Sequence, residues 1–349
     1  MIDNEHFDET VQGVTKRFSL GNYPLQQGAT LRNAWISYRT HGALNAAKDN
    51  AILFPHMYSG SHKDMELYVQ KNWACDPDKY FIILPGQFGN GVSSSPSNTP
   101  PPYNMGAFPH VQIEDDVIAQ HRLVTEEFGI SELQLVTGWS MGAQQTYEWA
   151  IRYPDMVKRA APIAGTARCT PHDKLFIECH MDQIRSDPNF NGGFYTEPHA
   201  CHVGLRRHAQ IWGVMGCSTE FYKTEAWRDC GFSSANDYIQ GYYETWFLPM
   251  DPNNLLTMAW KWQHGDSSRN TGGDLAAALG RIRAKTFVMP FESDMFFPVK
   301  DTETEQQMIP NSDLKVIPSL WGHFAMLSMD PADHEKIDNL LKELLAIEV

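Results

Sequence analysis

The chain has 349 residues, of which 42% are hydrophobic and 20% charged, and this ordinary globular composition excludes a disordered, collagen-like or coiled-coil protein. Its 28 basic and 42 acidic residues give a formal net charge of −14, which makes it a poor binder of nucleic acids and other polyanions. Because the sequence contains neither a long apolar run nor a signal-like N-terminus, we expect a cytoplasmic protein with no membrane partner.

The first third of the chain is predicted to consist of strands joined by loops. Residues 31–38 alternate partly between apolar and polar types, as in a half-buried strand, and 51–55 and 80–85 are short apolar runs that end at a proline. Such continuous apolar runs are typical of parallel strands that are buried on both faces. Residues 89–109 are rich in Gly, Ser, Asn and Pro, and we expect a long loop there.

Strands and helices alternate in the next segment. The hydrophobic pattern predicts a helix over 113–128 that ends at Gly129, a strand over 133–137, a helix over 143–153 and a strand over 159–163. This alternation indicates a parallel sheet whose strands are joined by right-handed crossovers.

The chain changes character between about residues 168 and 280, where strand-like runs are few and Trp, Tyr, His and Cys are frequent. Helical patterns at 174–185, 202–215 and 255–262 predict an inserted helical cap.

The α/β pattern returns after the cap. Strands are predicted over 286–291 and 314–317, and helices over 302–308 and 332–347. We therefore predict a core domain formed by 1–167 and 281–349, and a cap domain formed by 168–280. This division accounts for a length that is too great for one hydrophobic core.

The six cysteines are too sparse for a disulfide scaffold. His199, Cys201 and His202, with Cys179 and His180 upstream, are side chains that zinc prefers, but their spacing matches none of its usual arrangements. We expect buried thiols and surface histidines in a helical region, and no metal.

Residues 138–142 (GWSMG) match the pattern G-x-S-x-G. The pentapeptide is moderate evidence by itself, since a tight turn with an incidental serine has the same pattern. Here a predicted strand precedes it and a predicted helix follows directly, which is the context of a nucleophile elbow. The dipole of that helix favours negative charge near Ser140. The sequence therefore predicts Ser140 as a nucleophile.

A serine nucleophile needs a general base that is oriented by an acid. Where the serine lies on such an elbow, the acid and then the histidine follow it along the chain. Asp294 and His323 each follow one of the two late strands, at the sheet edge where α/β proteins build their sites. We predict Asp294 as the orienting acid and His323 as the general base, with Glu292 and Asp301 as alternative acids.

Acyl-transfer chemistry also needs two backbone N–H groups that hold the oxyanion. We expect one from Met141, directly after the nucleophile, and the other from Tyr58, in the loop 56–62 that follows an early strand. The Tyr58 phenol is also a candidate for the acyl pocket, although a packed aromatic explains it equally well.

These residues together resemble the homoserine O-acetyltransferase branch of the α/β-hydrolase superfamily over residues 15–345. The similar segments are 138–145, 148–154, 238–241, 251–254, 293–298 and 322–327. The resemblance implies an α/β-hydrolase fold with a mostly parallel central sheet and an inserted helical cap. It also implies the triad Ser140, Asp294 and His323, a covalent acyl-enzyme, and a homodimer that packs through the cap.

Two departures from that family favour hydrolysis over acyl transfer. The resemblance implies an aspartate directly after the histidine, where this chain has Phe324. It also implies a cap arginine that pairs with the substrate carboxylate, where an ungapped alignment places Ala209. The neighbouring Arg206 and Arg207 face differently, because each residue turns a helix by about 100°. Without a fixed guanidinium, a two-pronged grip on a carboxylate is lost.

Aromatic residues suggest an apolar substrate pocket instead. Trp212, Trp246, Trp260 and Trp262 lie in the predicted cap, although aromatics in a cap are more often plain core. We predict that Tyr58, Trp139, Trp212 and Phe324 line the pocket.

The sequence thus predicts a serine carboxylic-ester hydrolase that acts on small neutral esters, with water as acceptor, without a cofactor. The acetyl group is the acyl group that the resemblance implies. The alternative is a homoserine O-acetyltransferase-type acyltransferase that uses acetyl-CoA. A non-catalytic binding module would keep the same fold. A nucleotide-binding protein has little support, because residues 86–91 fit neither the dinucleotide fingerprint nor a P-loop.

Overall fold

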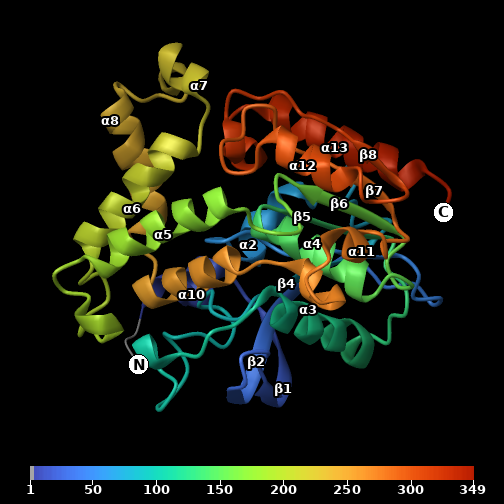
Figure 1. Ribbon diagram of the computed structural model, residues 1–349, viewed down its shortest axis with the longest axis horizontal. Helices are drawn as coiled ribbons and strands as arrows, with labels where there is room; N and C mark the ends of the chain where they lie inside the picture. The colour runs from blue at the N-terminus through green and yellow to red at the C-terminus, as the bar shows by residue number, and fades with distance from the viewer. Residues whose placement is uncertain (1–3) are drawn as a thin grey trace.

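A mostly parallel β-sheet organises the computed structural model, which describes residues 4–349 (Figure 1). Its eight strands lie in the order β1-β2-β4-β3-β5-β6-β7-β8. They are β1 (Lys16–Pro24), β2 (Thr30–His41), β3 (Ala51–Leu53), β4 (Phe81–Pro85), β5 (Leu135–Trp139), β6 (Arg159–Ile163), β7 (Lys285–Val288) and β8 (Ser312–Leu314). The pairs β1–β2 and β2–β4 are antiparallel, and every pair from β4 to β8 is parallel. The predicted α/β fold is confirmed. Residues 1–3, which begin the predicted core domain, lie outside the described residues.

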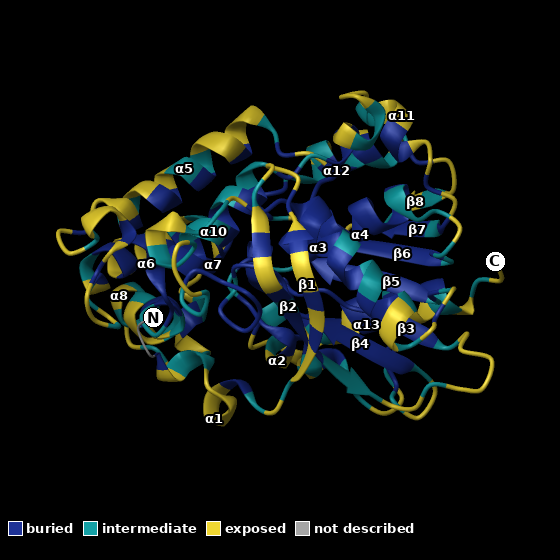
Figure 2. Cartoon of the chain, turned by 90° about the horizontal axis from the view of Figure 1, so that it is seen from below, coloured by how far each residue is buried: buried dark blue, intermediate teal, exposed yellow. Residues whose placement is uncertain are grey.

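The central strands are buried along their whole length, as their continuous apolar runs predicted. Every residue of β3, β4, β5 and β6 is buried, and these strands are dark blue in Figure 2. Helix α4 packs on β5 and β6, and the C-terminal helix α13 packs on β6 and β7. The helices outside the cap segment are α1 (Glu9–Gln12), α2 (His62–Met65), α3 (Ile113–Arg122), α4 (Met141–Arg152), α12 (Val299–Gln306) and α13 (Pro331–Ala346).

Strand β1 was not predicted, because its apolar pattern is interrupted. Phe18 and Leu20 alternate with exposed residues, but the next buried position is Tyr23, three residues on. The register of β1 against β2 shifts on both sides of Gly21, which is the irregularity that breaks the period of two.

The late strands are shorter than the predicted ranges 286–291 and 314–317, but the pairing continues beyond them. Met289 forms an isolated bridge with Ile163, and Phe291 forms one with Ile317. These bridges carry the sheet edge towards the loop that holds Asp294.

Between β6 and β7 the chain contains helices and turns, and none of the eight strands. The helices are α5 (Pro171–Arg185), α6 (His202–Met215), α7 (Thr219–Lys223), α8 (Ala235–Tyr238), α9 (Thr245–Phe247), α10 (Pro252–Gln263) and α11 (Leu275–Leu279). In Figure 1, α5, α6, α8 and α10 gather on the left of the sheet, whereas α11 lies next to α4. The division into a core domain (1–167 and 281–349) and a cap domain (168–280) stays a prediction.

No helix among residues 4–349 combines the length and the apolar character that a membrane crossing requires.

Candidate active site

Ser140 lies on the sharp turn between β5 and α4. Its backbone has φ 59° and ψ −118°, a conformation that residues other than glycine rarely adopt and that costs about 1–3 kcal/mol. The turn is held at both ends: the Ser140 N–H donates to the carbonyl of Ile163 on β6 at 2.9 Å, and the Ser140 carbonyl accepts from Ala143 N–H at 2.9 Å. Because the strained residue is the serine itself, the elbow presents its hydroxyl at the end of the strand.

The two glycines of the motif are required by close backbone packing. A Cβ atom at Gly138 would collide with the backbone of Gly142, and one at Gly142 would lie 2.5 Å from the carbonyl oxygen of Pro55. The elbow therefore packs directly against the chain that leads into the loop containing Tyr58. The spacing G-x-S-x-G follows from these two contacts.

The three residues predicted as a triad form a continuous hydrogen-bonded chain. His323 Nε2 lies 2.9 Å from Ser140 Oγ, and His323 Nδ1 lies 2.7 Å from Asp294 Oδ2. The other carboxylate oxygen, Asp294 Oδ1, accepts the N–H groups of Phe296 at 2.8 Å and Phe297 at 3.1 Å. All three side chains are buried. In this arrangement His323 can take the serine proton while Asp294 holds the opposite ring nitrogen.

Neither alternative acid reaches His323. Glu292 is exposed, and Asp301 lies in the first turn of α12 without a hydrogen bond to the histidine. The imidazole is positioned instead by its own turn, Gly322–Leu327, where the His323 N–H donates to the carbonyl of Gly216 at 2.9 Å. Gly322 has φ 53°, and a Cβ there would lie 2.8 Å from that same carbonyl. The segment predicted as a cap thus contributes a backbone contact that fixes the base.

The two predicted oxyanion donors lie on either side of Ser140. Met141 begins α4, and Tyr58 lines the pocket that contains Ser140 and His323. Within residues 4–349, neither the Met141 N–H nor the Tyr58 N–H donates to a protein acceptor. Both amides are therefore available for a substrate oxygen.

Three side chains that had no predicted role fix the loop before Tyr58. His56 Nδ1 lies 2.9 Å from the carbonyl of Met57, Asn90 Nδ2 lies 3.0 Å from His56 Nε2, and Gln87 Nε2 donates to the His56 carbonyl at 2.6 Å. Burial lowers the pKa of His56 to about 3, so the ring is neutral and can donate from Nδ1 and accept at Nε2. Gln87 and Asn90 lie in the segment 86–91. In the sequence, this glycine-containing segment was a candidate only for nucleotide binding.

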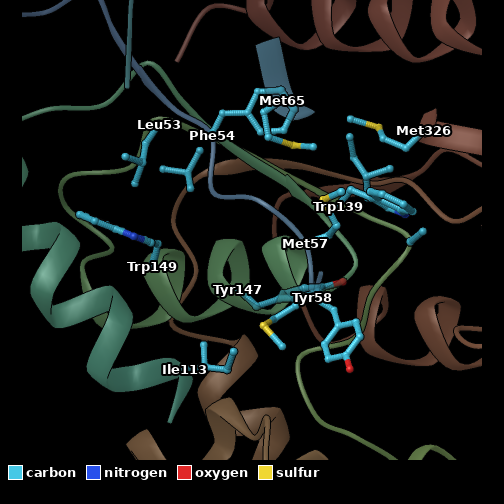
Figure 3. Packing of buried hydrophobic residues seen from close by; sticks show 14 of the residues in the cluster. Leu53, Phe54, Met57, Tyr58, Met65, Ile113, Trp139, Tyr147, Trp149 and Met326 are labelled. Carbon is cyan, nitrogen blue, oxygen red and sulfur yellow. The ribbon is translucent and has the colours of Figure 1, made fainter. Parts of the chain in front are cut away.

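The pocket around Ser140 is small, and no Asp, Glu, Lys or Arg side chain lines it. Its lining residues are Met57, Tyr58, Ser59, Trp139, Ser140, Trp212, Trp246, His323, Phe324 and Leu327. The structure thus brings the four predicted pocket residues together beside Ser140. The free volume is about 10 Å³, close to what one water molecule needs. Figure 3 shows three of the wall residues, Met57, Tyr58 and Trp139, within the buried cluster.

Comparisons with known proteins agree with this architecture. The family description "alpha/beta hydrolase fold" matches residues 50–205. An ethyl acetate hydrolase from Pseudomonas veronii is 51% identical over 344 residues, which cover 98% of this chain and 99% of that protein. The chain belongs to the α/β-hydrolase family.

Two further comparisons place this α/β-hydrolase within the family. The crystal structure of an acetylester hydrolase from Corynebacterium glutamicum superposes with a TM-score of 0.97 at 50% identity, and the match covers 99% of this chain and 100% of that one. A homoserine O-acetyltransferase from Methanobrevibacter ruminantium is 30% identical, over 94% of this chain and 73% of that protein. These matches confirm the resemblance and the predicted class of carboxylic ester hydrolase, and the acyltransferases are the more distant relatives.

No arginine enters the pocket of this α/β-hydrolase from α6. Ala209, at the position where the resemblance implies an arginine, is buried, whereas Arg206 and Arg207 are exposed. The guanidinium of Arg206 is paired with the buried carboxylate of Glu244. As predicted, Arg206 and Arg207 therefore face a different direction from Ala209, the position at which the resemblance implies an arginine.

Of the four cap tryptophans that suggested an apolar pocket, two do not line it. Trp260 is stacked between His110 and His264, with ring centroids 4.0 and 3.9 Å away, and it does not line the pocket. Trp262 lies behind the pocket wall, with its ring 5.7 Å from that of Tyr58. The two tryptophans are two positions apart on α10, about 200° around the helix, so they cannot face the same side.

The histidines and cysteines of residues 179–202 do not form a metal site in the described part of the chain. Within residues 4–349, no three His, Cys, Asp or Glu side chains are placed to hold a metal ion. His199 and His202 are exposed and Cys201 is buried, as expected, but Cys179 is exposed and His180 is buried. The reason is the period of α5, which buries Ile177, His180, Met181 and Ile184 and turns Cys179 outwards.

Replacing Gly142 by alanine is expected to lower the free energy of unfolding by about 1–3 kcal/mol and to reduce esterase activity, because the added methyl group meets the Pro55 carbonyl. Thermal unfolding and initial rates check this. Gly280→Ala is the control, since Gly280 has right-handed helical backbone at the end of α11. Equal stability and activity of Gly142→Ala and the control would show that the elbow tolerates a side chain.

Proposed function

We propose that this α/β-hydrolase cleaves small, neutral, short-chain esters, acetyl esters above all, through an acyl-enzyme on Ser140. The observation that carries the proposal is the hydrogen-bonded chain from Asp294 through His323 to Ser140, which ends in a small apolar pocket. The 51% identity to an ethyl acetate hydrolase over nearly the whole chain supports the same substrate class.

In the first half-reaction, Ser140 Oγ attacks the ester carbonyl while its proton passes to His323 Nε2. Asp294 Oδ2 accepts a hydrogen bond from the Nδ1–H of His323 and, still ionised, stabilises the imidazolium. The amides of Met141 and Tyr58 hold the oxyanion, and each such donor contributes about 2.7–4 kcal/mol to transition-state stabilisation. The alcohol then leaves with the proton of His323.

In the second half-reaction, water takes the place of the alcohol. His323 removes a proton from the water as its oxygen attacks the acyl carbon, and Ser140 Oγ leaves with that proton. The aromatic rings of Trp139, Phe296 and Phe297 lie within 5.6 Å of the His323 ring, centroid to centroid, and limit the water around it.

The charge of the pocket supports a neutral substrate. No lysine or arginine lines it, and the nearby Arg206 is engaged by Glu244. The carboxylate of an amino-acid acceptor would therefore enter an apolar site without a partner, which is strongly unfavourable. Water and uncharged esters meet no such penalty, so hydrolysis is favoured over transfer to homoserine.

The size of the pocket supports a small acyl group. Trp212 is held in the wall by a hydrogen bond from its Nε1 to His208 Nε2 at 3.0 Å. Burial lowers the pKa of His208 to about 3, so this imidazole is neutral and its Nε2 can accept. Phe324 packs against Trp139 and Trp212, with ring centroids 6.0 and 5.7 Å apart. These fixed aromatics leave little room beyond a methyl group.

A panel of ethyl esters tests the proposal. The kcat/KM for ethyl acetate is expected to exceed that for ethyl hexanoate by at least about tenfold. The reason is that each methylene group that the pocket cannot hold lowers kcat/KM by a factor of that order. The same preparation is given acetyl-CoA and homoserine, and no acetylhomoserine above the Ser140→Ala background is expected. Acetylation of homoserine faster than ester hydrolysis would instead identify the protein as an acyltransferase.

A homodimer that packs through residues 168–280 and a cytoplasmic location are also proposals. The dimer rests on the family resemblance, and the location on the ordinary globular composition with few cysteines. Sedimentation and cell fractionation test them.

A further inference from the structure

A second cavity, of about 250 Å³, lies next to the Ser140 pocket. We call it the vestibule. Its wall combines the N-terminal segment, the loops after β3 and β4, and the segment between β6 and β7. The apolar residues in this wall include Phe7, Val11, Val92, Met250, Leu255 and Met258.

The vestibule and the Ser140 pocket share part of their walls. Tyr58, Ser59 and Trp246 line both cavities. The indole Nε1 of Trp246 donates to Ser59 Oγ at 2.9 Å, so this contact lies at the boundary. Trp246 is half-buried on the short helix α9, and a single neutral hydrogen bond contributes little net stability, which lets the boundary open.

We propose that the vestibule receives the alcohol portion of the ester, and that Trp246 and Ser59 form the gate between it and Ser140. This inference rests on the proposed esterase function. The Ser140 pocket has a free volume of about 10 Å³, so it cannot enclose a whole ester whose carbonyl carbon lies at Ser140 Oγ. The remainder of the substrate has to extend into neighbouring space, and the vestibule adjoins that pocket.

The chemistry of the vestibule indicates which alcohols it takes. Its wall combines apolar side chains with polar ones such as the amides of Asn90 and Asn254, and the Asp64 carboxylate in it accepts the Ser61 N–H at 2.7 Å. Lys63 is exposed and its ammonium is engaged by the carbonyl of Val11. The site therefore suits a flexible, uncharged alkyl alcohol. In this proposal the gate and the vestibule determine which alcohol chains the enzyme accepts.

Two acetate esters test this inference: methyl acetate and hexyl acetate. Both esters give the same acetyl-enzyme, so its hydrolysis is the same step for both. The ratio of their kcat/KM values therefore measures how well the enzyme accepts each alcohol portion. Val11→Trp narrows the vestibule from the N-terminal side, and Thr245→Trp narrows it from the cap side; both positions are exposed. Each variant is expected to lower the hexyl-to-methyl ratio at least about tenfold.

The matched control is Val14→Trp. Val14 belongs to the same N-terminal segment, is 77% exposed and does not line the vestibule, so the ratio should stay within about twofold of the unmodified protein. Trp246→Ala removes the gate and is expected to raise the ratio. An unchanged ratio in a folded Val11→Trp or Thr245→Trp protein that hydrolyses methyl acetate would overturn the vestibule assignment and leave the esterase function standing. Failure of the unmodified protein to hydrolyse either ester would overturn both.

Discussion

Replacing Ser140 by alanine is expected to lower kcat for acetyl-ester hydrolysis by about 10⁴- to 10⁶-fold, because Ser59, the other serine in the pocket, is hydrogen-bonded to Trp246 and not to the histidine base. The residual rate would come from the oxyanion donors and substrate binding. Initial rates with p-nitrophenyl acetate measure the effect. The circular dichroism spectrum should be unchanged, since Ser140 Oγ is bonded only to His323.

The matched control for this substitution is Ser268→Ala. Ser268 is also a buried serine, but its hydroxyl donates to Asp266, outside the catalytic pocket. Its kcat should stay within about twofold of the unmodified protein. If Ser140→Ala and Ser268→Ala retained equal activity, Ser140 would not be the nucleophile.

Replacing Asp294 by asparagine is expected to lower kcat by about 10⁴-fold. The side-chain carbonyl of asparagine can still accept the N–H groups of Phe296 and Phe297, so the loop should keep its shape. Its NH₂ group, however, would face His323 Nδ1 and favour the tautomer with the proton on Nε2. That tautomer cannot take a proton from Ser140. The loss should appear in kcat with KM nearly unchanged.

Glu292→Gln provides the comparison for the acid. Glu292 lies two residues from Asp294 and was an alternative acid, but its side chain is exposed. Its kcat is expected to stay within about twofold. An inactive Glu292→Gln together with an active Asp294→Asn would reassign the acid.

The parts of the site that the sequence predicted are those encoded by short local patterns. Residues 138–142 specify a turn that tolerates glycine alone at two positions, and Asp294 and His323 follow late strands. The structure brings all three side chains into one hydrogen-bonded chain. A parallel sheet collects the carboxyl ends of its strands at one edge, which is why chain order alone was informative.

The parts that the sequence did not predict depend on contacts between distant segments. His56, Gln87 and Asn90 fix the loop that contains Tyr58, and nothing in their local sequence pairs them. Ser59 and Trp246 meet across 187 positions of the chain. Trp260 and Trp262 face different sides of α10, so aromatic content alone does not indicate which cap tryptophan lines a pocket.

The proposed preference for water over an amino-acid acceptor rests on the residues at two positions. Phe324 occupies the place where the resemblance implies an aspartate, and it packs against Trp139, Trp212 and Tyr243. Ala209 occupies the place of the implied arginine and is fully buried. At both positions apolar packing stands where the resemblance implies a polar group, so the proposed site has no side chain there to hold a charged acceptor.

Covalent labelling of the nucleophile tests the central claim most directly. Diethyl p-nitrophenyl phosphate transfers a diethylphosphoryl group to an activated serine, and this product hydrolyses far more slowly than an acyl-enzyme. We expect one p-nitrophenol released per chain, loss of esterase activity in proportion, and the phosphoryl group on Ser140 when the peptides are mapped by mass spectrometry. A label on another residue, or a fully labelled Ser140 with undiminished ester hydrolysis, would contradict the account.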